Sequence, residues 1–121
     1  MVAGMIRNAL IVAVVFLLSE ICIIAAAPVQ IYDPATDKWS FGTVMPKVVW
    51  QAAAGATSGV LAPKRIFLIG GIPEKSIDGT NLNQIYNPEN DSWTVGTLMP
   101  TARFNLQIAV LNDNVMGGFL S

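Results

Sequence analysis

"IYDPATDKW" (residues 31–39) returns almost unchanged as "IYNPENDSW" (residues 85–93). Each copy is an apolar, β-prone pair followed by Asx-Pro, a polar turn and a tryptophan. Asp or Asn at the first turn position accepts a hydrogen bond from the backbone ahead of it, and proline at the next position has its φ already set. The phrase therefore predicts two short strands joined by a tight turn, built twice in one chain.

The likeness continues beyond the phrase, since "WSFGTVMP" (39–46) and "WTVGTLMP" (93–100) share Trp, Gly, Thr, Met and Pro. Between the copies, "RIFLIGG" (65–71) is an apolar run closed by two glycines, a polar loop (72–82) follows, and "VMGG" (115–118) is a shortened version of the run. The predicted order is strand, turn, strand ending in Gly-Gly, loop, strand, turn and a short strand opening with Trp. Four short strands per unit of roughly 50 residues are typical of a β-propeller blade.

Composition excludes several classes of function. The 121 residues include 7 basic and 8 acidic ones and no basic run, so binding of nucleic acid has no electrostatic support. The chain has no histidine, which rules out a Ser-His-Asp or Cys-His arrangement and a histidine-ligated metal site. We predict no catalytic residue, metal ligand or cofactor site. The single cysteine, Cys22, cannot form an internal disulfide and does not indicate the compartment.

Taken together, the motifs resemble the kelch motif, in which paired glycines precede a Tyr and then a Trp. The resemblance covers residues 29–118. It implies an all-β fold, an incomplete kelch-type β-propeller of about two and a half four-stranded antiparallel blades. In that family the glycine pair ends the second strand, and Tyr and Trp pack between blades, so we expect these aromatic side chains in the core. The residues that carry the resemblance are Tyr32, Trp39, Gly70, Gly71, Tyr86, Trp93, Gly117 and Gly118, supported by Met45-Pro46 and Met99-Pro100.

The repeat divides the chain into a degenerate first blade (1–41), a second blade (42–95) and the truncated first half of a third (96–121). Closed propellers need at least four blades. We therefore expect a fragment of a longer propeller, or a chain that completes a ring by self-association or by pairing with further kelch units.

Residues 9–27 allow two interpretations. Their apolar run, ending in small residues, is typical of a signal peptide or membrane anchor. Yet "EICIIAA" (20–26) also aligns with "RIFLIGG", with alanines in place of both glycines. As blade structure the segment would form strands over 10–16 and 21–25, in a cytoplasmic protein. As a targeting segment it would make this an exported or membrane-anchored kelch protein.

Function is expected in the loops. Alternating strand direction places the loop after the second strand (72–82) on the same face as the linkers after the fourth (42–49 and 96–103). In kelch proteins that face commonly holds a protein or peptide partner, so the resemblance implies a non-catalytic interaction module. Some kelch-like propellers resemble galactose oxidase, but the copper site of that family includes histidine ligands, which this chain lacks. The candidate partner-binding residues are Lys47, Glu74, Lys75, Asp78, Asn81 and Arg103.

Overall fold

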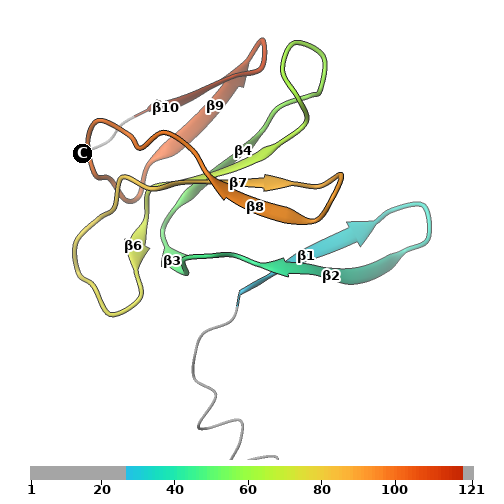
Figure 1. Ribbon diagram of the computed structural model, residues 1–121, viewed down its shortest axis with the longest axis horizontal. Helices are drawn as coiled ribbons and strands as arrows, with labels where there is room; N and C mark the ends of the chain where they lie inside the picture. The colour runs from blue at the N-terminus through green and yellow to red at the C-terminus, as the bar shows by residue number, and fades with distance from the viewer. Residues whose placement is uncertain (1–26, 119–121) are drawn as a thin grey trace, which may run out of the picture.

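The computed structural model describes residues 27–118, which form β-strands and connecting turns without a helix (Figure 1). The expected all-β fold is confirmed. The strands are β1 (Pro28–Asp33), β2 (Lys38–Val44), β3 (Val49–Trp50), β4 (Ala53–Ala56), β5 (Ile66–Ile69), β6 (Ile72–Pro73), β7 (Asn83–Asn87), β8 (Ser92–Val95), β9 (Gln107–Leu111) and β10 (Asn114–Gly118).

The predictions about the N-terminal segment concern a different part of the chain. The strands expected over 10–16 and 21–25 lie outside the described residues, and so does the alternative targeting segment over 9–27, except for Ala27. From residue 27 to residue 118, the structure has no helix with the length and apolar character needed to span a membrane.

A four-stranded antiparallel sheet in the order β4-β5-β7-β8 forms the centre of the array. Its inner strands carry the β-branched and aromatic residues of "IFLI" (66–69) and "NQIYN" (83–87), which suit a pleated, packed surface. Ile66 pairs with Tyr86 and Ile69 pairs with Asn83. The order and direction of these strands are those of one propeller blade.

Two hairpins flank the central sheet, β1–β2 beside the β7–β8 side and β9–β10 beside β4 (Figure 1). The sheet and its flanking hairpins make an incomplete propeller. A hydrophobic core between the central sheet and β9–β10 contains buried Ala53, Ile69 and Leu106. The partly buried side chains packed against this core are Phe67, Met99, Ile108 and Val115.

The glycine pair that follows β5 has a backbone that only glycine adopts readily. The φ angles of Gly70 and Gly71 are 69° and 93°, in the left-handed region. A Cβ on Gly71 would also lie 2.7 Å from the carbonyl oxygen of Trp50. Gly117 lacks such a φ, because β10 pairs with β9 in a register that keeps Gly117 within the strand, opposite Ile108. The two glycine pairs are therefore not structurally equivalent.

The expectation that all four repeat aromatics are core residues is wrong for the first pair. Tyr86 is 2% exposed and Trp93 is half-buried, whereas Tyr32 is 45% and Trp39 66% exposed. The reason is the surroundings of the hairpin: β1–β2 is a two-stranded sheet, and no third strand among residues 27–118 pairs with it.

Candidate functional site

The linkers and the long loop meet at one end of the blades, on a surface that we call the loop face (residues 45–50, 72–82 and 96–106). Backbone hydrogen bonds join the long loop, together with the glycine before it, to the second linker. Gly71 N donates to Arg103 O at 2.8 Å, Arg103 N donates to Thr80 O at 3.1 Å, and Thr80 N donates to Gly71 O at 2.8 Å. The end of the long loop is therefore fixed against the linker that leads to β9.

A second set of bonds involves Asn81. Its carbonyl oxygen accepts from Met99 N at 2.9 Å, and its side-chain Nδ2 donates to Met99 O at 3.3 Å. Asn81 thus joins the loop to the linker through both backbone and side chain, so its role as a partner-binding residue would be combined with a structural one.

The first linker (45–50) is attached to the long loop by β3, which pairs with β6, and by Glu74 N, which donates to Val48 O at 3.3 Å. Lys47 is held through its backbone. Its N–H donates to Gln84 Oε1 and its carbonyl oxygen accepts from Gln84 Nε2, both at 2.8 Å. Gln84 is 1% exposed, and these bonds satisfy its buried amide. The Lys47 side chain is left exposed.

The tip of the long loop is shaped by Ser76 and by an unusual backbone at Lys75. Ser76 N donates to Pro73 O at 3.0 Å, Asp78 N donates to Ser76 Oγ at 3.1 Å, and Lys75 has a φ of 64°. Lys75 and Asp78 are exposed, and Ile77 between them is 89% exposed. Glu74, Asn81 and Arg103 are half-buried. The structure thus brings all six candidate residues onto the loop face.

The candidate residues predicted from the sequence are polar or charged, and the apolar residues on this face are not among them. Trp50 is 59% and Phe104 44% exposed, in addition to Ile77. Phe104 supports the loop, because a Cβ added to Gly79 would lie 2.9 Å from Phe104 Cδ1. Trp50 and Phe104 share a sequence position that could have identified them. Each stands four residues after the proline of Met-Pro, in "MPKVVW" and "MPTARF".

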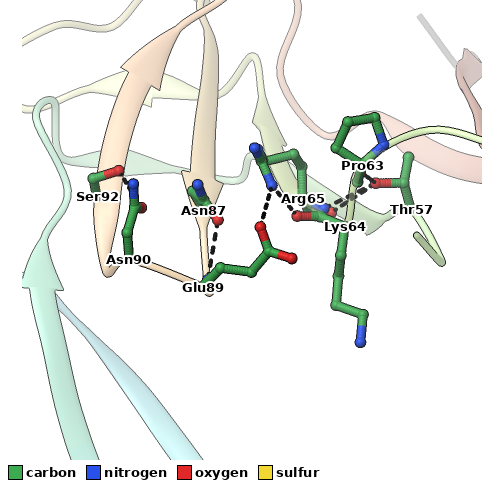
Figure 2. Close-up of polar contacts among 8 residues, drawn as sticks. All are labelled: Thr57, Pro63, Lys64, Arg65, Asn87, Glu89, Asn90 and Ser92. Atoms are coloured by element: carbon green, nitrogen blue, oxygen red, sulfur yellow. Dashed lines mark hydrogen bonds and ion pairs between the residues drawn. The ribbon is translucent and has the colours of Figure 1, made fainter.

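The opposite end of the blade carries the tight turns, and its polar groups mostly bond to one another (Figure 2). Arg65 Nη1 lies 3.4 Å from Glu89 Oε2, which links the turn before β5 to the turn after β7. Thr57 Oγ1 donates to Pro63 O at 2.6 Å and accepts from Arg65 N at 2.9 Å. These contacts stabilise the turns.

Aspartates at this turn end also join neighbouring hairpins. The Asp113 carboxylate accepts from the backbone N–H groups of Ser58, Leu61 and Ala62, and these bonds lower its pKa. Because these donors belong to the loop after β4, Asp113 links β9–β10 to the central sheet.

Asp91 makes the corresponding link on the other side of the central sheet. Thr43 N donates to Asp91 Oδ1 at 2.7 Å, and Tyr86 Oη donates to the same oxygen at 2.8 Å. These bonds lower the pKa of Asp91, the Thr43 bond most. Burial, and then Asp91, raise the pKa of Tyr86. Trp93 Nε1 completes the contact by donating to Thr43 O at 3.0 Å.

Within residues 27–118, no group of three or more His, Cys, Asp and Glu side chains is placed to hold a metal ion. The loop face carries exposed Lys47, Lys75 and Asp78, half-buried Glu74 and Arg103, and the exposed apolar residues Trp50, Ile77 and Phe104.

The comparisons with known proteins agree with the fold. No family model matches the chain. Among curated proteins, it is 30% identical over 95 residues to Kelch repeat and BTB domain-containing protein 12 of Danio rerio, covering 74% of this chain and 14% of the relative. It is 37% identical over 76 residues to Kelch-like protein 23 of Mus musculus, covering 63% of this chain and 13% of the relative. Identity to Kelch-like protein 35 of Mus musculus is 27% over 95 residues (77% and 16%).

The protein has one antiparallel blade, flanked by two hairpins that each correspond to half of such a blade, and the blade contains the glycine, Tyr and Trp motif. This arrangement defines a repeat protein of the propeller type. The chain belongs to the kelch-repeat family. The matched region spans about one-seventh of the length of these relatives, between 13% and 16%.

Proposed function

We propose that the chain is a non-catalytic protein-interaction module that binds a protein or peptide partner through the loop face. The observation that carries this proposal is the loop tip. Ile77 is 89% exposed between exposed Lys75 and Asp78, while the ends of the same loop are hydrogen-bonded to both linkers. An apolar side chain surrounded by charged ones has the arrangement of a small interface, with an apolar centre and a polar rim.

The fixed ends of the loop favour binding in a second way. A loop that is ordered before binding loses less conformational entropy when a partner docks. The aromatics Trp50 and Phe104 add exposed apolar surface to the same face. Because its charges are of both signs, the loop face suits a peptide that combines an apolar anchor with charged neighbours better than a strongly acidic or basic one.

The test is selection of peptides from a displayed random library, followed by affinity measurement on two variants of the chain. The loop variant combines Lys75→Ala, Ile77→Ser and Asp78→Ala, and should bind selected peptides at least about tenfold more weakly, as loss of an interface anchor does. The matched control is Glu89→Ala at the turn end, which should bind them as the unchanged chain does.

Stability provides the second readout. Lys75→Ala and Asp78→Ala should each change the free energy of unfolding by about 0.5 kcal/mol or less, as exposed loop substitutions usually do. Equal weakening by the loop variant and by Glu89→Ala, or failure to select any peptide, would contradict the proposal. So would a large loss of stability in the loop variant.

A further inference from the structure

The hairpin β7–β8 holds the end of the preceding hairpin with five hydrogen bonds. Asp91 accepts from Thr43 N at 2.7 Å through its carboxylate and from Thr43 Oγ1 at 2.9 Å through its carbonyl, and Trp93 Nε1 donates to Thr43 O at 3.0 Å. Gln84 makes the two bonds to the Lys47 backbone at 2.8 Å. We call Gln84, Asp91 and Trp93 the inner clamp and residues 42–47 its occupant.

The first hairpin has the same clamp residues at the corresponding positions. Gln30, Asp37 and Trp39 stand in β1–β2 where the inner clamp residues stand in β7–β8, and we call them the outer clamp. Its Asp37 already has the local bond of the inner clamp, because Tyr32 Oη donates to Asp37 Oδ1 at 2.9 Å, matching the bond from Tyr86 to Asp91. Gln30, Asp37 and Trp39 are all exposed, and no segment of residues 27–118 occupies the outer clamp.

The chain also carries a second copy of the occupant. "GTLMPT" (96–101) repeats "GTVMPK" (42–47) at Gly, Thr, Met and Pro. Thr97 and Thr101 stand in the positions of Thr43 and Lys47, and both are exposed. The outer clamp and residues 96–101 thus lie on opposite sides of the central sheet. They cannot contact each other within the described structure.

The unpaired edges of β1 and β10 are also complementary to each other. By sequence, β1–β2 corresponds to the third and fourth strands of the central sheet, and β9–β10 corresponds to the first and second. In the central sheet the second and third strands, β5 and β7, pair antiparallel. Among the described strands, β1 pairs only with β2 and β10 only with β9. Such unpaired edges are templates for pairing with another chain.

We propose that two copies of this chain associate head to tail, with the outer clamp of one copy binding residues 96–101 of the other. The strands β9–β10 of the second copy and β1–β2 of the first then form one composite four-stranded blade. The contact repeats the junction between hairpins already present inside each chain. Because it joins different surfaces, repetition would extend it into a ring or an open array. This inference rests on the kelch-repeat architecture and not on partner binding by the loop tip (residues 75–78), although residues 96–101 belong to the loop face.

Directed cross-linking tests the pairing. In a Cys22→Ser background, Thr97→Cys and Asp37→Cys are made in separate chains, at the positions that correspond to the hydrogen-bonded pair Thr43 and Asp91. Under oxidising conditions, the mixture should give a disulfide-linked dimer containing one chain of each kind. Either variant alone should give little dimer. A cross-link that forms equally well in Thr97→Cys alone, or none in the mixture, would overturn the proposal.

Sedimentation of the unchanged chain gives an independent measurement. We expect association that increases with concentration, and Trp39→Ala should weaken it about tenfold, as loss of an aromatic anchor does. Trp39 is exposed in one copy, so circular dichroism should show the variant still folded. The loop variant should associate normally, which separates failure of this inference from failure of the loop-face proposal. A chain that stays monomeric at all concentrations would overturn it.

Discussion

The hairpins β1–β2 and β7–β8 contain nearly the same residues in different surroundings. In each, a Tyr ring and a Trp ring lie 5.2 Å apart between centroids, with interplanar angles of 42° and 48°. In each, the Tyr hydroxyl donates to an Asp five residues further on. Yet Tyr86 is 2% exposed and Tyr32 is 45% exposed.

This difference shows which features of a hairpin depend on its own sequence and which depend on the segments packed against it. The turn and the ring pair form in both hairpins because their partners lie within a few residues. Burial of β7–β8 requires β5 on one edge and residues 42–47 against its inner clamp. Matched substitutions in the two hairpins should therefore have unequal effects, and the inequality measures the contribution of the neighbour.

The largest inequality is expected for tyrosine. Tyr86→Ala should lower the free energy of unfolding by about 3–5 kcal/mol, because it empties a large, buried packing site. Tyr32→Ala should cost about 1 kcal/mol or less, since its ring is partly exposed already. Urea unfolding followed by tryptophan fluorescence measures both. Equal losses would mean that Tyr32 is buried in solution, by self-association or by a segment outside residues 27–118.

A smaller inequality is expected for the clamp glutamines. Gln84→Ala should cost about 1–3 kcal/mol, because the Lys47 backbone loses both partners at a buried position. Gln30→Ala should stay within about 0.5 kcal/mol, as exposed substitutions usually do. The same unfolding measurement at low protein concentration, where association is weakest, gives the comparison. A neutral Gln84→Ala would show that water replaces the glutamine without cost.

Strand order could be predicted from the sequence because turn chemistry is local. Asx-Pro and the glycines at 70–71 mark chain reversals by their own backbone preferences, and apolar runs between them can only be strands in units this short. Exposure could not be predicted in the same way. Tyr32 and Tyr86 have nearly identical sequence neighbours, so only the presence of an adjacent hairpin distinguishes them.

The candidate site was predicted in part. Strand alternation correctly places Lys75 and Arg103 on segments that meet, since it depends only on counting strands. The structural role of Gln84 could not be seen, because a glutamine within a strand gives no sign that its amide will bind a distant backbone. The exposure of Trp50 and Phe104 could not be predicted, because aromatic side chains are buried or exposed according to neighbours that the local sequence does not specify.

The smallest expected effect concerns Asp91, which is exposed to solvent and therefore screened. Hydrogen bonds from Thr43 and Tyr86 lower its pKa below the ordinary value of 3.8. A lowered pKa in the folded state contributes stability that is fully present above the ordinary value and is lost as the pH falls through the lower one. The free energy of unfolding should therefore decline with acid below about pH 4.

Asp91→Asn should reduce that acid-dependent decline without removing it, because Asp33 and Asp113 also have lowered pKa values. The measurement is urea unfolding at a series of pH values from neutral to acidic. Asn90→Ala, an uncharged change at the adjacent residue, serves as the control and should leave the slope as it is. If Asp91→Asn also leaves the slope unchanged, the bonds from Thr43 and Tyr86 do not favour the charged carboxylate, and the inner clamp depends on Gln84 and Trp93 instead.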